Sequence, residues 1–134
     1  MVVVIDNSIL VPLFLEDEDS AVAEEIFQRE ELELYAPELL LAEFGNVMLV
    51  CLRRGRLTDR EVHEAHEALN ESGLEFCGIP SLHQREQTHD LAVKNQLSYY
   101  DATYLALTLE KKGKLATLDK ALQKAAEAEK VAYL

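Results

Sequence analysis

Long apolar runs are missing from this chain, and so are several motifs that would assign it to a common class of protein. No apolar run approaches the roughly 18–20 residues that a membrane-spanning helix needs. The segment VVVIDNS has no basic region and no small-residue cleavage site, so we expect no signal peptide. Neither a Walker-type glycine loop nor a G-x-G-x-x-G motif is present, so nucleotide-cofactor chemistry has no support.

Cysteine is scarce as well. The two cysteines, Cys51 and Cys77, both lie in apolar surroundings. We interpret them as buried, reduced thiols of a cytoplasmic protein, because disulfides persist mainly in oxidising compartments. Internal repeats and linkers rich in Pro, Gly or Ser are also absent. A chain of 134 residues without such breaks predicts a single domain over residues 1–134.

Basic residues are few in the first part of the chain. The net charge is −12, and residues 1–50 contain 12 acids and one base, Arg29. Hydrophobic residues make up 49% of the chain, which excludes a disordered class. Phosphate contacts need local positive charge. The bulk composition therefore argues against a nucleic-acid partner unless basic residues gather locally.

Strand-like and helical segments alternate along the chain. The apolar run VVVI at 2–5 is typical of a parallel strand that is buried on both faces. Further strands are expected at 33–36, 74–79, 114–119 and 130–134. Helices are expected from Ser8 to Phe14, from Ser20, from Pro37 to Gly55, from Thr58 to near Gly73, from Ser81 to about Leu97, from Ser98 to Gly113, and over 120–129. The alternation predicts an α/β fold with a mostly parallel sheet that is covered on both faces.

Two aspartates stand where strands are expected to end. Asp6 follows VVVI and Asp119 follows LATL. Each could simply cap the next helix. However, ligands of open α/β sheets bind outside the carboxyl ends of the strands. If the two strands are neighbours, their ends lie about 4.8 Å apart, and carboxylates so close repel each other unless a cation or a shared proton intervenes.

Two further acids lie on expected helices. Glu43 shares an apolar helix face with the amide of Asn46, and a charge among apolar side chains is costly unless it is paired or bound to a metal. The alternative is an ion pair with Arg54 at the edge of an interface. This helix is apolar nearly all round, which indicates packing against another subunit. Asp101 follows Ser98 by three residues, and a purely structural role in the first helical turn explains it equally well.

Four carboxylates at one crevice would form a set of hard oxygen ligands. Such a set suits Mg²⁺ or Mn²⁺ and not Zn²⁺. One or two of these ions can lower the pKa of a bound water and stabilise an in-line displacement at phosphorus. The reaction class that follows is phosphodiester hydrolysis, without a histidine or cysteine nucleophile.

Four short motifs occur in order along essentially the whole chain: Asp6-Asn7-Ser8 after an apolar strand, Glu43-Phe44-Gly45-Asn46-Val47, Asp101-Ala102-Thr103-Tyr104-Leu105-Ala106-Leu107, and Thr117-Leu118-Asp119. Together they resemble the PIN-domain family, and most of all its compact prokaryotic members, the VapC-type toxins. The resemblance implies a three-layer α/β/α sandwich with a central, mostly parallel sheet. It also implies a divalent-metal-dependent ribonuclease.

The resemblance assigns roles to particular residues. It implies that the catalytic, metal-binding cluster is formed by Asp6, Glu43, Asp101 and Asp119. The hydroxyls of Ser8 and Thr117 and the amide of Asn46 match groups that support such a cluster. The implied cofactor is Mg²⁺ or Mn²⁺ and the implied substrate is RNA. The expected protein partners are a small antitoxin, whose tail fills the active-site groove, and further copies of the chain in a homodimer or a dimer of dimers.

Two other functions stay open. The chain could be a PIN-type nuclease of RNA processing that is not a toxin, or a non-catalytic PIN-like binding or scaffold protein whose acids only cap helices. The candidate RNA contacts are Arg53, Arg54 and Arg56. Basic residues at the end of a helix also complement its dipole, so these three arginines alone do not distinguish the alternatives.

Overall fold

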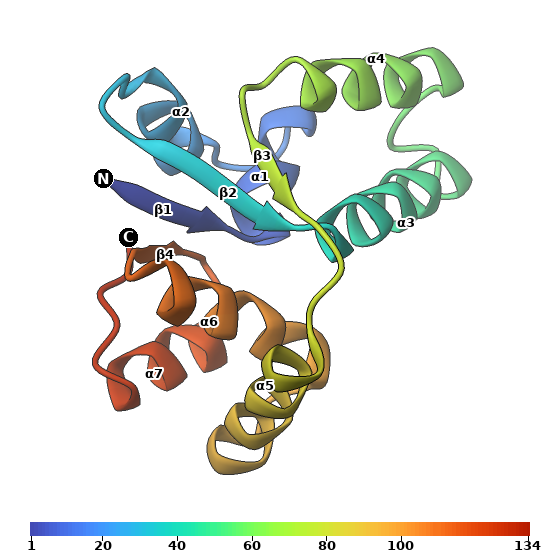
Figure 1. Ribbon diagram of the computed structural model, residues 1–134. Helices are drawn as coiled ribbons and strands as arrows, with labels where there is room; N and C mark the ends of the chain where they lie inside the picture. The colour runs from blue at the N-terminus through green and yellow to red at the C-terminus, as the bar shows by residue number, and fades with distance from the viewer.

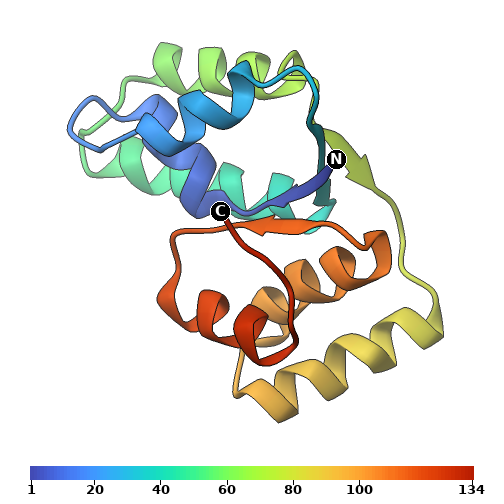
Figure 2. The same ribbon diagram turned by 90° about the vertical axis from the view of Figure 1, so that its left-hand side faces the viewer.

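The structure of residues 1–134, a computed structural model, is built around one parallel sheet. Its strands are β1 (Val2–Ile5), β2 (Glu33–Pro37), β3 (Glu75–Cys77) and β4 (Lys114–Ala116), in the spatial order β3-β2-β1-β4. Helices cover both faces of this sheet (Figures 1 and 2). The α/β/α sandwich that the sequence predicts is therefore confirmed.

The helices divide into two layers. One layer holds α1 (Asn7–Leu10), the 3₁₀ helix η1 (Val11–Phe14), α2 (Ala21–Gln28), α3 (Leu39–Arg53) and α4 (Asp59–Asn70). The other layer holds α5 (Leu82–Asn95), α6 (Tyr99–Lys111) and α7 (Lys120–Ala128). Figure 2 shows the sheet between the two layers. None of the helices combines the length and the apolar character that crossing a membrane requires.

Strand β1 lies at the centre of the core. Val3, Val4 and Ile5 are completely buried, as the continuous apolar run predicts for a strand covered on both faces. Ile5 is aligned with Ala116 of the neighbouring strand β4. The next residues, Asp6 and Thr117, therefore leave the sheet side by side at its carboxyl edge.

The structure departs from the expected elements at three places. The N-cap of α1 is Asp6 and not Ser8, because the Asp6 carboxylate accepts the backbone N–H of Ser8. Pro37 ends β2, where it is aligned with Cys77 of β3, so α3 begins only at Leu39. The last strand, expected at 130–134, is reduced to a single bridge between Tyr133 and Leu115 of β4.

Candidate functional site

Asp6 is the most buried of the four acids, and three donors hold its carboxylate. Its side chain lies where β1 passes into α1, and the residue is only 7% exposed. Oδ1 accepts the backbone N–H of Ser8 at 3.0 Å and the Ser8 hydroxyl at 2.5 Å. Oδ2 accepts the Thr117 hydroxyl at 2.5 Å. The two hydroxyls expected to support the cluster thus contact Asp6 directly.

The backbone fixes the direction of both hydroxyls. The N–H of Leu118 donates to Ser8 Oγ at 2.8 Å, and the N–H of Asp119 donates to Thr117 Oγ1 at 3.0 Å. Each hydroxyl oxygen is therefore already an acceptor, and its proton remains available for Asp6. Because Ser8 follows β1 and Thr117 follows β4, this network ties the ends of the two strands together.

Asp119 begins α7 just beyond this network. Its Oδ1 accepts the N–H of Leu122 at 3.0 Å, which makes Asp119 the N-cap of α7. The purely structural interpretation is thus correct for Asp6 and Asp119 as far as capping goes. Capping is compatible with a role in metal binding, because it fixes both carboxylates at the carboxyl edge of the sheet. It also leaves Asp119 Oδ2 without a protein partner.

Glu43 is held by a tyrosine from the other layer of helices. The hydroxyl of Tyr104, on α6, donates to Glu43 Oε1 on α3. Tyr104 is only 2% exposed, so this contact bridges the two layers at the edge of the sheet. The suggested ion pair between Glu43 and Arg54 is absent, because neither side chain forms an ion pair.

Burial and a neighbouring negative charge raise the pKa values of two of the four acids. Burial raises the pKa of Asp6 above its ordinary value, and the hydrogen bonds from Ser8 and Thr117 offset part of that rise. The pKa of Asp101 is raised by burial and then by the negative charge of Asp119.

The pKa of Tyr104 reports on the same neighbourhood. It is raised by burial, by the bond to Glu43, and by the charges of Glu43, Asp6 and Asp101. The Tyr104 hydroxyl therefore stays protonated and acts as a donor. No lysine, arginine or histidine pairs with any of the four acids, so their mutual repulsion is uncompensated by the protein.

The four acids fit a hard divalent cation by their chemistry. No three carboxylate, histidine or cysteine side chains of the chain converge closely enough to hold an ion together. Mg²⁺ does not require such a cage, because it keeps several waters and is bound through one or two carboxylates. The hydrogen bonds of Glu43 and Asp119 each use one carboxylate oxygen, which leaves the second oxygen of each free for an ion.

The other predicted site residues lie farther out. Asn46 is exposed on α3, one turn after Glu43. Arg53 and Arg54 are exposed at the end of this helix, about 15 Å along its axis from Glu43 at roughly 1.5 Å per residue. The guanidinium of Arg56 is already paired, with Asp17 Oδ1 at 3.0 Å. Of the three arginines, Arg53 and Arg54 are therefore the ones whose charge is not used within the chain.

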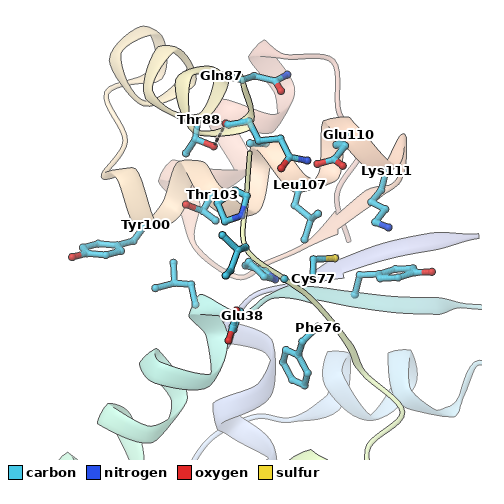
Figure 3. A pocket seen from close by; sticks show the side chains of 18 of the residues that line it. Glu38, Phe76, Cys77, Gln87, Thr88, Tyr100, Thr103, Leu107, Glu110 and Lys111 are labelled. Atoms are coloured by element: carbon cyan, nitrogen blue, oxygen red, sulfur yellow. Dashed lines mark hydrogen bonds between the residues drawn. The ribbon is translucent and has the colours of Figure 1, made fainter. Parts of the chain in front are cut away.

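A cleft of about 870 Å³, drawn in Figure 3, is not lined by Asp6, Glu43, Asp101 or Asp119. Its walls come from β2, β3, the start of α3, and the helices α5 and α6. Tyr99, Tyr100 and Thr103, which flank Asp101 along α6, are among its lining residues. The cleft thus adjoins the acidic site at α6, and the two are distinct.

Two polar contacts at the site were not anticipated from the sequence. The first is the bond from Tyr104 to Glu43, for which the signal was available: a tyrosine buried in a helix usually needs a partner for its hydroxyl. The second involves Asn7, whose Nδ2 donates to the carbonyl of Leu40 on α3 at 3.4 Å. Asn7 Oδ1 is buried without a partner, and no spacing in the sequence indicated this.

Comparisons with known proteins agree with this geometry. The family model of the PIN domain matches residues 3–128. The chain is 32% identical over 126 residues to ribonuclease VapC3 of Pyrobaculum aerophilum, covering 91% of this chain and 92% of that protein.

Solved structures show the same fold. One is VapC20 of Mycobacterium tuberculosis, described as a toxin that cleaves the sarcin-ricin loop, with a TM-score of 0.69 at 16% identity over 92% of this chain and 94% of the other. Another is VapBC2 of Rickettsia felis bound to a DNA fragment of its promoter, with a TM-score of 0.70 at 12% identity over 100% and 98% of the two chains.

Proposed function

Since the chain belongs to the PIN-domain family, we propose that it is a divalent-metal-dependent endoribonuclease that hydrolyses RNA phosphodiester bonds with water as the nucleophile. The observation that carries this proposal is that the charges of Asp6, Glu43, Asp101 and Asp119 act on one another or on the shared neighbour Tyr104, while no cationic side chain pairs with any of them. A purely structural set of acids would be stabilised by lysine or arginine partners, because uncompensated charges at a partly buried site are costly. The name of the relative in Pyrobaculum supports the same activity.

The proposed cofactor is Mg²⁺ or Mn²⁺, bound among these four carboxylates with water completing its coordination. When bound, the ion supplies positive charge that lowers the pKa of a coordinated water and offsets the charge that develops on the phosphate. Asp6 is the anchor of the site, because Ser8 and Thr117 fix both of its oxygens. Asp119 and Glu43 each offer one free oxygen, and Asp101 completes the negative field that attracts the ion.

RNA would have to reach this site past an acidic surface. Arg53 and Arg54 are the proposed phosphate contacts, because both are exposed and unpaired. Arg56 is a weaker candidate than its neighbours, since binding a phosphate would require it to leave Asp17. Asn46 lies on the same helix between the acids and these arginines, where its amide can meet the RNA backbone or support Glu43.

The proposed biological role is that of a toxin in a toxin–antitoxin pair, in the cytoplasm. The relatives named VapC and VapBC support this role. An antitoxin is the proposed protein partner. A homodimer or a dimer of dimers is supported by α3, which leaves Leu41 and Leu49 43% and 38% exposed. A short upstream reading frame that encodes a DNA-binding protein would favour the toxin over an RNA-processing enzyme.

The activity is tested by incubating the chain with a labelled, structured RNA in Mg²⁺, in Mn²⁺ and in EDTA. Asp6→Asn and Asp101→Asn are compared with Asp90→Asn, whose acid is exposed on α5 and forms no ion pair. We expect cleavage that needs the metal, is lost in Asp6→Asn and Asp101→Asn, and persists in Asp90→Asn. Cleavage that survives in both site variants would come from a contaminating nuclease. Absence of cleavage together with absence of metal binding would favour the non-catalytic scaffold.

A further inference from the structure

Tyr104 occupies an unusual position among the residues of the site. Its ring is part of the hydrophobic core and is almost completely buried. Its hydroxyl emerges from that core beside the acids and donates to Glu43 Oε1. It is the only side-chain donor that contacts Glu43, and the residues it joins lie on α3 and α6, 61 positions apart in the chain.

We propose that Tyr104 is a positioning residue for the metal site, which acts through Glu43 by holding one carboxylate oxygen so that the other faces the site. This inference rests on the proposed function, because it presumes that the four acids bind a divalent cation. Tyr104 itself would not touch the ion or the RNA.

The geometry supports a positioning role over simple packing. A phenylalanine would fill the same space in the core, so packing alone does not explain the hydroxyl. Glu43 has no other side-chain hydrogen bond and no basic partner. Without the hydroxyl, the free rotamers of a glutamate would let its carboxylate swing away from Asp6 and Asp101, whose negative charge repels it.

Position along α6 supports the same role. Asp101 and Tyr104 are three residues apart, so both project from one face of this helix. Helix α6 thereby supplies Asp101 directly and, through Tyr104, orients Glu43 of α3. The charges of Asp6 and Asp101 both act on the Tyr104 hydroxyl, which places that hydroxyl within the electrostatic reach of the site.

The test uses the full chain and measures Mn²⁺ binding by calorimetry, with circular dichroism to verify folding. Tyr104→Phe keeps the ring and removes the hydroxyl. The matched control is Tyr133→Phe, which removes an equivalent bond, from Tyr133 to Glu127, at the exposed end of the chain. We expect the Mn²⁺ dissociation constant of Tyr104→Phe to rise about 10–100-fold, the usual effect of losing a group that orients a metal ligand, and that of Tyr133→Phe to stay unchanged.

A second pair of variants separates positioning from a general loss of stability. Tyr104→Phe is introduced into Glu43→Gln, and we expect no further loss of Mn²⁺ affinity, because the hydroxyl acts through the glutamate. An affinity of Tyr104→Phe within twofold of the unmodified chain would overturn this inference alone. An equal loss in the Glu43→Gln background would also overturn it. If the unmodified chain bound no Mn²⁺, the proposed metal-dependent function would fail together with it.

Discussion

The hydroxyl of Thr117 is expected to stabilise the metal-free protein more than any other hydroxyl of the core. Thr117 is completely buried, donates to Asp6 Oδ2 and accepts the N–H of Asp119. Thr117→Val keeps the shape of the side chain and removes both bonds. A buried bond to a charged group contributes about 1.5–3 kcal/mol and a neutral bond about 0.5–1.5 kcal/mol. We therefore expect the free energy of unfolding to fall by about 2–4 kcal/mol.

The matched control is Thr108→Val. Thr108 is also completely buried, but its hydroxyl only donates to the carbonyl of Tyr104 within α6, so its loss should cost at most about 1 kcal/mol. Both variants are unfolded with urea in EDTA, and their Mn²⁺ affinity is measured by calorimetry. We expect only Thr117→Val to weaken Mn²⁺ binding. Equal losses of stability, or unchanged Mn²⁺ binding in Thr117→Val, would refute the view that this hydroxyl anchors Asp6.

Three further predictions concern the charges of the site. Asp119→Asn should raise the free energy of unfolding of the metal-free protein by on the order of 1 kcal/mol. Asparagine still caps α7, while the repulsion between Asp119 and Asp101 is lost. A lower urea midpoint would contradict this prediction. In EDTA, the raised pKa values of Asp6 and Asp101 mean that these two groups bind protons more tightly in the folded than in the unfolded state. Their contribution to stability should therefore be lost as the pH rises through the raised pKa values, which is measured as the slope of the urea midpoint against pH. This pH slope should be shallower in Asp101→Asn, and an identical slope would contradict the assignment. Mn²⁺ at 100 times its dissociation constant should stabilise the unmodified chain by about 2.7 kcal/mol, measured by thermal unfolding, and Asp119→Asn should respond less.

Local sequence signals predicted most of the helices and strands. The apolar run at 2–5 indicated a central strand, and the helices expected from Thr58 and Ser81 both begin with a capping box, formed with Glu61 and Gln84 respectively. These signals are local, because a helix cap and a buried strand each depend on residues that are close in sequence. The final segment at 130–134 was harder, since its pairing with Leu115 of β4 is a contact between residues distant in sequence.

The arrangement of the site was only partly predictable. Asp6 and Asp119 could be placed together because both follow strands, and strand ends meet at one edge of the sheet. The partner of Glu43 could not, because a helix-periodic pattern shows the face of a side chain and not which distant residue meets it. Arg54, on the same helix, was the alternative partner that the spacing allowed, whereas the actual partner, Tyr104, comes from the opposite layer.

The donors of Asp6 also change the choice of test variants. Asp6→Asn would place an amide N–H₂ against hydroxyls whose protons point to the carboxylate, so its effect on stability combines lost repulsion with lost hydrogen bonds. We therefore expect Asp119→Asn to report the repulsion more clearly than Asp6→Asn, although both should weaken metal binding.

Water is the proposed nucleophile at the RNA phosphate, at a site built from carboxylates. None of the four acids pairs with a histidine or lysine. The most direct test is to cleave RNA in Mg²⁺ in water enriched in ¹⁸O and to analyse the new ends by mass spectrometry. We predict a linear terminal phosphate that contains ¹⁸O from the solvent. A 2′,3′-cyclic phosphate without solvent oxygen would contradict the account, because the ribose hydroxyl would then be the nucleophile.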